Sequence, residues 1–397
     1  MGDYIMVGCD MSDRSLVLEA GRNSEEAEKR SFANSPEGRR KMLQFLVERS
    51  RECAAAQIVF AYEAGPHGFG LYDELTAAGI RTHVLAPSLL PQSVKGRKDK
   101  TDAKDALRIL EVLRGHLLAG NRLPTVWVPD PITRDDREIV RSRLDVDRKT
   151  RRVHAQIRML LKRISVGKPD GLGKGWTNGF RAWLRGLAKS PSPMGSGARI
   201  ALTSLLRQLE MHEEEIKALD QAVANLAVEE RYRAQVERLD AESGVGVLTA
   251  MVFLTEMGNL NRFSNRRQVA AYLGIVASKY LTGNAQNRYG RITRQGSSRV
   301  RALLCQAAWR RVKADPTERA RYERIVAGKP YRAKRAIVAC MRHLAIRLWH
   351  RARNANEETP PPVPQRGRRQ FALPAQPRKY ERRSPAHVSV EERRRAV

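Results

Sequence analysis

The sequence has few cysteines and no long apolar run, and both shortages exclude classes of protein. Its 397 residues include only four cysteines, which lie far apart and lack C-x-x-C spacing. We therefore expect reduced, buried thiols in place of a disulfide framework or a zinc site. No apolar run approaches the roughly 18 residues of a membrane span, and the N-terminal segment MGDYIMVGCD has an early acid and no basic flank. The sequence thus predicts a cytoplasmic protein with no membrane partner.

Acidic residues are also scarce. The chain has 73 Lys and Arg residues against 43 Asp and Glu residues, a formal net charge of +30. Such an excess of positive charge needs a polyanionic partner, and nucleic acid is expected before an acidic membrane. With 42% hydrophobic residues the chain can bury a core, and its length predicts two or three domains of about 150 residues each.

Residues 1–130 are predicted to form a mixed α/β domain. Apolar, β-favouring runs and amphipathic segments predict the order three strands, helix, strand, helix, strand, helix. The expected strands cover residues 4–9, 15–19, 29–33, 57–62 and 81–86, and the expected helices begin at Pro36 and cover 70–78 and 102–118. This is the order of a ribonuclease-H-like (RuvC-like) fold, although several other α/β folds begin in the same way.

Residues 136–230 are predicted to form a coiled-coil region. Apolar residues repeat at steps of three and four over residues 139–164, and the repeat is more regular over residues 202–226. The many Gly and Pro residues between 165 and 197 exclude one continuous helix. The two stripes fit helices that pair as an antiparallel hairpin or across subunits, and they also fit ordinary amphipathic helices on a core.

Residues 231–356 are predicted to form a helical domain that is dense in arginine. Residues 286–313 and 329–353 each hold eight basic residues and no acid. A basic run is commonly a solvated helix face, but two acid-free stretches on a chain of this charge favour contacts with phosphate. The arginines expected to contact nucleic acid are Arg288, Arg291, Arg294, Arg299 and Arg301. Residues 357–397 are rich in Pro and Arg and are predicted to form a disordered basic tail.

Four carboxylates stand at positions from which they can converge. Asp10 and Glu63 end two of the predicted strands, and Asp102 and Asp105 lie three residues apart on one helix face. Gathered carboxylates repel one another and need cations, and Mg²⁺ prefers oxygen ligands of this kind. Two Mg²⁺ ions about 4 Å apart would stabilise the attacking and leaving oxygens of a phosphoryl transfer. The alternative for each acid taken alone is a surface position or a helix cap.

Two glycine-containing segments in the C-terminal half also attract attention. Gly244 and Gly246 form a G-x-G turn before an apolar run, which fits a turn that holds a DNA phosphate and fits a plain helix–helix turn equally well. Thr282 stands in a glycine-flanked loop among arginines, where a hydroxyl could attack a phosphodiester. Loop threonines are common, so this position alone does not establish a nucleophile.

Seven short motifs between residues 7 and 304 resemble a known family, and the resemblance covers roughly residues 4–350. The N-terminal motifs are V-G-C-D at residues 7–10, Y-E-A-G at 62–65 and K-T-D-A-K-D-A at 100–106. The C-terminal motifs are A-Y-L-G at 271–274, Y-L-T-G at 280–283, I-T-R-Q-G at 292–296 and R-V-R-A-L-L at 299–304. In this order they resemble the DEDD insertion-sequence transposases, whose relatives include the pilin-gene inversion recombinase and the bridge-RNA-guided recombinases.

This resemblance implies a ribonuclease-H-like catalytic domain, a coiled-coil connector and a helical C-terminal transposase domain. It implies that Asp10, Glu63, Asp102 and Asp105 bind Mg²⁺. In the family a serine is thought to form a covalent 5′-phosphoryl link to DNA, and the matching position here is Thr282. Threonine keeps the hydroxyl but adds a β-methyl that restricts χ1. One alternative is therefore a shifted register, in which the nucleophile is Ser278, Ser297 or Ser298. A third possibility is impaired strand transfer.

The resemblance also implies partners. They are double-stranded DNA, a noncoding guide RNA and further copies of the chain in a dimer or tetramer, with the stripe at residues 202–226 as a candidate interface. The implied location is the cytoplasm of a prokaryote, at the nucleoid. Two other functions stay open from the sequence: a structure-selective Mg²⁺-dependent nuclease, and a nucleic-acid-binding protein without catalysis.

Overall fold

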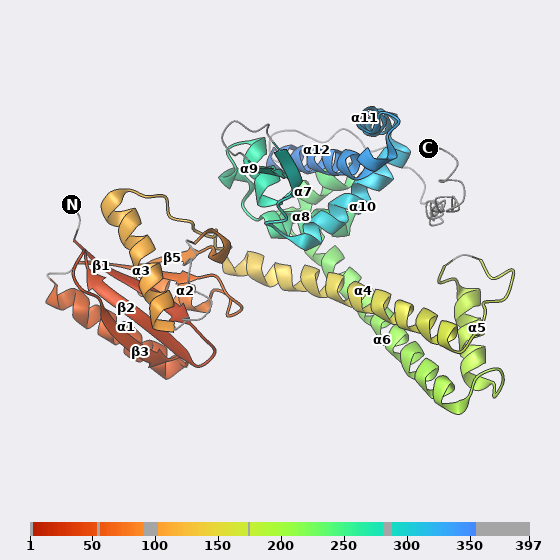
Figure 1. Cartoon of the computed structure of the whole chain (residues 1–397), viewed down its shortest axis with the longest axis horizontal. Coiled ribbons are helices and arrows are strands. Elements are labelled where there is room, and N and C mark those ends of the chain that lie inside the picture. Colours follow the sequence, from red (N-terminus) through yellow and green to blue (C-terminus); the bar gives the residue numbers. More distant parts are fainter. Residues whose placement is uncertain (1–2, 54–55, 91–101, 174, 281–287, 355–397) are drawn as a thin grey trace, which may run out of the picture.

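The computed structural model describes residues 3–53, 56–90, 102–173, 175–280 and 288–354 (Figure 1). Thr282 and the predicted tail at 357–397 lie outside these residues. The described chain is mixed α/β with helix as its main component. It consists of a sheet region (residues 3–119), a helical hairpin (residues 131–227) and a C-terminal helical region (residues 230–353). No described helix combines the length and the apolar character that a membrane span requires.

The sheet region contains five strands in the order β3-β2-β1-β4-β5. The strands are β1 (Tyr4–Met11), β2 (Ser15–Arg22), β3 (Glu28–Ala33), β4 (Gln57–Glu63) and β5 (Arg81–Leu85). β1, β2 and β3 pair antiparallel, whereas β4 pairs parallel with both β1 and β5. The helices are α1 (Pro36–Glu52), α2 (Gly70–Ala77) and α3 (Asp102–Ala119), with the short helix η1 (Pro87–Leu89) after β5. The element order predicted from the sequence is confirmed.

The two faces of the sheet bury different helices because side chains alternate along a strand. Val7 and Tyr62 pack in one cluster with Met42 of α1 and Leu75 of α2. Met6, Val59 and Ala61 pack on the other face with α3, through Ile109, Leu110 and Leu113. A Cβ added to Gly8 would lie 2.3 Å from the carbonyl oxygen of Ala106, so the backbone of α3 rests directly on β1. This close approach places the first turns of α3 beside the carboxyl end of β1.

The helical hairpin consists of α4 (Pro131–Arg163), α5 (Asn178–Lys189) and α6 (Ser196–Ala227). α4 and α6 run side by side, with α5 at the far end (Figure 1). Leu202 and Leu209 of the predicted stripe are buried against α4 and α5, and Val223 and Leu226 are buried in the C-terminal core. His212 is half-buried. The stripe expected at a subunit interface is therefore largely covered within one chain, because α4 provides the apolar partner face.

The C-terminal helical region is built around the buried helix α8 (Val247–Met257). The other helices are α7 (Glu230–Asp240), η2 (Leu260–Arg262), α9 (Arg266–Tyr272), α10 (Ser298–Ala314), α11 (Pro316–Val326), η3 (Pro330–Arg332) and α12 (Ala333–Arg353). The region also contains an antiparallel hairpin of β6 (Ala277–Tyr280) and β7 (Arg288–Ile292). The region is mostly helical, as expected, but the sequence did not predict this hairpin, because basic residues in β7 resemble a charged helix face in sequence.

Candidate active site

Asp10 and Glu63 lie at the same end of two neighbouring strands. β1 and β4 are parallel and in register, with Cys9 opposite Tyr62. The alternation that puts Gly8 and Ala61 under α3 puts Asp10 and Glu63, two residues further along each strand, on the same face. The sheet thus presents two carboxylates toward the first turns of α3.

Helix α3 adds Asp105 to this group through one arginine. The Arg108 Nη2 atom donates to Glu63 Oε1 at 2.6 Å and lies 3.3 Å from Asp105 Oδ1. Arg108 is one turn after Asp105, so the pair is held on one helix face. Asp105 is a largely buried residue, at 9% exposed. The structure therefore brings Glu63 and Asp105, two of the four predicted carboxylates, to one guanidinium.

These residues are of the chemical type that a hard divalent cation prefers as ligands. The donors are carboxylate oxygens, and a positive guanidinium already lies between two of them, which shows that this position favours a cation. The side chain of Asp102 is outside the described part. Within that part, no three His, Cys, Asp or Glu side chains are arranged as a ligand set for a metal ion.

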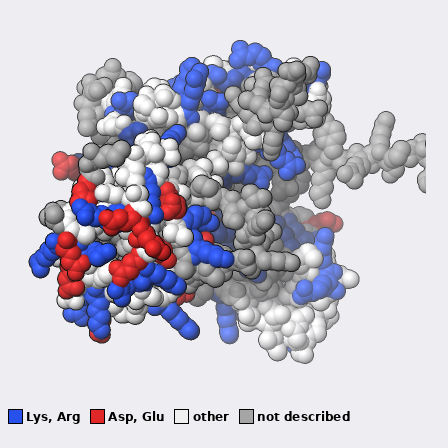
Figure 2. All heavy atoms as spheres, turned by 60° about the vertical axis from the view of Figure 1, so that its left-hand side comes forward, with Lys and Arg blue, Asp and Glu red and all other residues white. Residues whose placement is uncertain are grey.

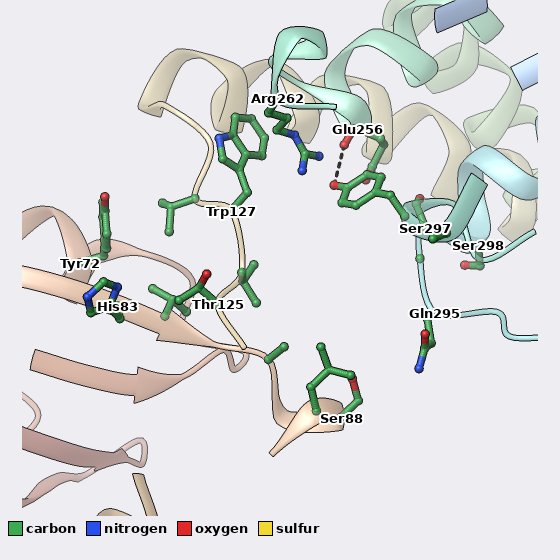
Figure 3. Close-up of a pocket in the computed structure, with 18 of the residues that line it drawn as sticks. Tyr72, His83, Ser88, Thr125, Trp127, Glu256, Arg262, Gln295, Ser297 and Ser298 are labelled. Atoms are coloured by element: carbon green, nitrogen blue, oxygen red, sulfur yellow. Dashed lines mark hydrogen bonds between the residues drawn. The ribbon is translucent and has the colours of Figure 1, made fainter. Parts of the chain in front are cut away.

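A cleft opens between the sheet region and the C-terminal helical region (Figure 3). It has a volume of about 1070 Å³ and is lined from both sides. His83 of β5 and Thr125 of the segment after α3 line one side, and Gln295, Ser297 and Ser298, around the start of α10, line the other. Both halves of the sequence therefore line the cleft, and a molecule bound there would contact both.

His83 is a neutral side chain in this cleft. Burial, followed by the positive charges of Arg81 and His116, lowers the pKa of His83 to about 4. Its Nε2 atom is buried and has no hydrogen-bond partner among the described residues. The imidazole is therefore uncharged at pH 7 and adds no positive charge to the cleft.

The predicted nucleophile Thr282 cannot be located, because it lies outside the described residues. Its three alternatives are visible. The Ser278 hydroxyl donates to the Arg291 carbonyl oxygen at 3.0 Å across the β6–β7 hairpin. The Ser297 hydroxyl caps α10 by accepting from the Val300 amide at 3.4 Å. Ser298, at the first position of α10, is an exposed residue beside the cleft.

The five arginines predicted to contact nucleic acid differ in their surroundings. Arg301 donates to the carbonyl oxygens of Gly296 and Leu273 at 2.7 and 3.2 Å, so it ties the preceding loop to α10. Arg299 lies 3.3 Å from Asp145 of α4. Arg291 and Arg294 are exposed, and the side chain of Arg288 is outside the described part. Exposed arginines are the better placed to reach phosphate.

The G-x-G turn at residues 244–246 packs against α10. Gly244 has a φ of +83°, and a Cβ there would lie 2.7 Å from the carbonyl oxygen of Ala307 in α10. Next to it, the buried Glu242 accepts from Arg311 at 2.6 Å and from Arg347 at 2.8 Å. These contacts favour a structural turn over a phosphate-binding loop.

A contact that the sequence did not predict joins the two sides of the cleft. The guanidinium carbon of Arg262 lies 4.5 Å from the ring centroid of Trp127 and 4.3 Å from that of Tyr272. Trp127 belongs to the segment between α3 and α4, and its ring rests on Gly258. The sequence signal was a tryptophan between two valines in the segment that connects α3 and α4.

Two family models match the chain. Residues 7–166 match the DEDD transposase model of the IS110 type, and residues 236–323 match the model described as the transposase IS116/IS110/IS902 family. The first match contains all four predicted carboxylates, and the second contains Thr282.

Curated relatives agree with these matches. A putative transposase, y4qE, of Sinorhizobium fredii is 31% identical over 78% of this chain and 73% of its own length. A second putative transposase of the same organism, y4rJ, is 28% identical over 72% of this chain and 75% of its own length. The transposase for insertion sequence element IS1533 of Leptospira borgpetersenii is 26% identical over 64% of this chain and 70% of its own length.

Proposed function

Because the chain belongs to the IS110 family of insertion-sequence transposases, we propose that it mobilises its own insertion sequence by Mg²⁺-dependent cleavage and rejoining of DNA strands. The observation that carries the proposal is the convergence of Glu63 and Asp105 on one guanidinium at the end of β4. Asp10, on the same face of the sheet, and Asp102, at the start of α3, complete the proposed ligand set.

The four carboxylates would hold one or two Mg²⁺ ions. When bound, the metal would supply activation of an attacking hydroxyl and stabilisation of a leaving oxygen. The chain's own contribution is rigidity, because the two strand acids are fixed by the register of β1 and β4. Asp105 is fixed by the packing of α3 on Gly8.

The proposed nucleophile is the Thr282 hydroxyl. Its oxygen forms a bond to the phosphorus, the bond from phosphorus to the DNA 3′ oxygen breaks, and the hydroxyl proton is transferred to that oxygen. The DNA is then linked to the protein through its 5′ phosphate. A 3′ hydroxyl of another strand reverses these steps, and the covalent link conserves the bond energy for rejoining.

Positive charge supports a nucleic-acid partner. On the face shown in Figure 2, acidic side chains gather on the sheet region, whereas the visible helical parts carry mostly Lys and Arg. We propose that these basic parts contact double-stranded DNA and a noncoding guide RNA, and that a dimer or tetramer carries out exchange between two duplexes.

The experiment that tests the function is an excision assay on a plasmid that carries the natural element with its flanking segments. Glu63→Gln and Asp105→Asn should abolish excision. Asp73→Asn is the matched control, since Asp73 of α2 pairs with Arg134 of α4 at 2.8 Å and not with Arg108. Full excision with either site variant would contradict the proposal.

A metal-dependent nuclease is the second candidate, because metal ions bound by the carboxylates could activate water to hydrolyse DNA without a protein nucleophile. A denaturation-resistant protein–DNA adduct that disappears in Thr282→Val would support recombination. Mg²⁺-dependent nicking without any adduct would support hydrolysis.

A further inference from the structure

Arg108 occupies an unusual position within the acidic group. A single nitrogen atom, Nη2, contacts the carboxylates of both Glu63 and Asp105. The side chains of Arg108 and Glu63 are 32% and 28% exposed, and that of Asp105 is 13% exposed. These values place the three charges in a partly desolvated position, where electrostatic interactions exceed those of an exposed surface pair.

The position of Arg108 coincides with the position that a metal would need. Two carboxylates within reach of one nitrogen repel each other unless a cation lies between them. Among the described residues, the guanidinium of Arg108 is a cation in this position. A divalent ion bound by Glu63 and Asp105 would meet this positive charge and would compete with it for the same Glu63 oxygen.

The guanidinium has space to move. Arg108 lines a second cavity of about 790 Å³, together with Glu111, Asn121 and Arg122. Its Nε atom is buried and has no hydrogen-bond partner among the described residues. Glu111, one turn further along α3, has its carboxylate on the wall of that cavity, where one oxygen accepts from Arg114 at 2.9 Å.

We propose that Arg108 is a built-in counter-cation that holds the carboxylates together in the metal-free protein and releases Glu63 when metal binds. This inference rests on the metal site of the proposed function. Arg108 is then a positioning residue that sets the metal affinity of the site. In the metal-loaded protein its side chain turns toward the second cavity.

The test measures Mn²⁺ binding to the full chain by isothermal titration calorimetry, without nucleic acid. Arg108→Gln should lower the Kd for Mn²⁺ about tenfold, because a competing positive charge is removed. Arg108→Lys keeps the charge and should stay within about threefold of the wild type. Arg39→Gln is the matched control: Arg39 pairs with Glu74 at 2.6 Å elsewhere in the sheet region, and its loss should leave the Kd unchanged.

The possible outcomes separate the two proposals. If the wild type binds Mn²⁺, Asp105→Asn does not, and Arg108→Gln binds no more tightly than the wild type, the role of Arg108 is wrong and the metal site stands. If the wild type binds no Mn²⁺, or Asp105→Asn binds as well as the wild type, both proposals are wrong.

A second measurement covers the case in which Arg108→Gln does not fold. The arginine side-chain NMR signals of the wild type are followed during a titration with diamagnetic Mg²⁺. The Arg108 Nε signal, assigned by its absence in Arg108→Lys, should shift with the occupancy of the site. A signal that stays in place while the site fills would overturn the proposal.

Discussion

Gly8 of β1 lies directly against the carbonyl oxygen of Ala106 in α3, and the distance from an added Cβ to that oxygen would be only 2.3 Å. The same Cβ would lie 2.4 Å from the amide nitrogen of Leu110. Gly8 comes two residues before Asp10, and Ala106 directly follows Asp105. The absence of a side chain at one position thus sets how closely two of the proposed metal ligands approach.

Gly8→Ala should therefore lower both stability and excision activity. The obstructing atoms belong to a helix backbone that cannot move alone, so we expect a loss of about 1–3 kcal/mol in the free energy of unfolding, measured by urea denaturation. Gly186→Ala is the control, because Gly186 lies inside α5 with open space around it, and alanine there should stabilise by roughly 0.5–1 kcal/mol. Equal effects of the two substitutions would contradict the close packing of α3 on β1.

The acidic site predicts a charge effect on metal-free stability. Glu63→Gln removes one of two carboxylates around Arg108 and leaves Asp105 as its counter-ion. We expect the thermal midpoint without metal to change little, because lost repulsion offsets the lost ion pair, while Mn²⁺ no longer raises the midpoint. Differential scanning fluorimetry with and without Mn²⁺ measures both. Stabilisation by Mn²⁺ that persists in Glu63→Gln would place the ion elsewhere.

The family position of Thr282 predicts a difference between two substitutions. Thr282→Ser removes only the β-methyl and should retain or increase adduct formation, since the smaller side chain is freer in χ1. Thr282→Val has nearly the shape of threonine but no hydroxyl, and it should reduce the adduct at least 100-fold. The readout is denaturing gel electrophoresis with labelled DNA. An undiminished adduct in Thr282→Val would transfer the role to another hydroxyl, and Ser298→Ala would then be the next variant.

The sheet and its acids could be predicted from the sequence because they depend on local patterns. Alternation along a strand and the positions of strand ends placed Asp10 and Glu63 together, and the helix predicted at 102–118 is α3 at Asp102–Ala119. The position of Arg108 beside Glu63 and Asp105 could not be predicted in this way. It depends on how α3 rests on β1, and that register is set by a tertiary contact at Gly8.

Contacts between distant segments were missed for the same reason. Nothing in the local pattern pairs Trp127 with Arg262, because the contact forms only after the C-terminal helices have packed. The β6–β7 hairpin was missed because its strands are short and basic. Conversely, the stripe at residues 202–226 was recognised as a packing surface, but periodicity alone does not say whether the partner helix belongs to the same chain.

His83 and His154 predict a loss of stability in mild acid. Burial first, and nearby positive charges second, lower the pKa of each to about 4. An unfolded histidine titrates near 6.5, so as the pH falls from about 6.5 to 4 the unfolded chain takes up protons that the folded chain does not. The folded state therefore loses stability over this window, by roughly 1–2 kcal/mol for each histidine after allowance for partial exposure. Thermal midpoints between pH 5 and 7 should depend less on pH in His83→Gln/His154→Gln, and an unchanged slope would contradict the assignment.

The contact between Trp127 and Gly258 predicts an interaction that a double-mutant cycle can measure. A Cβ on Gly258 would lie 2.1 Å from Cη2 of Trp127, and Gly258 also has a φ of +60°. Gly258→Ala thus has two costs, a collision with the indole and backbone strain, and only the first depends on Trp127. In a Trp127→Ala background the cost of Gly258→Ala should fall by about 1–3 kcal/mol, with the part due to φ left over.

Trp127→Ala alone should cost about 2–4 kcal/mol, because Arg262 loses one of its aromatic faces and a gap opens between the two sides of the cleft. Trp127→Phe, which keeps an aromatic ring, should cost less. Because the indole contacts Arg262 and Gly258 of the C-terminal region, Mn²⁺ binding should stay unchanged while excision falls. Strictly additive costs in the cycle, measured by chemical denaturation, would mean that the indole does not rest on Gly258. A parallel loss of Mn²⁺ binding would mean that the contact supports the sheet region itself, and not only its attachment to the C-terminal helices.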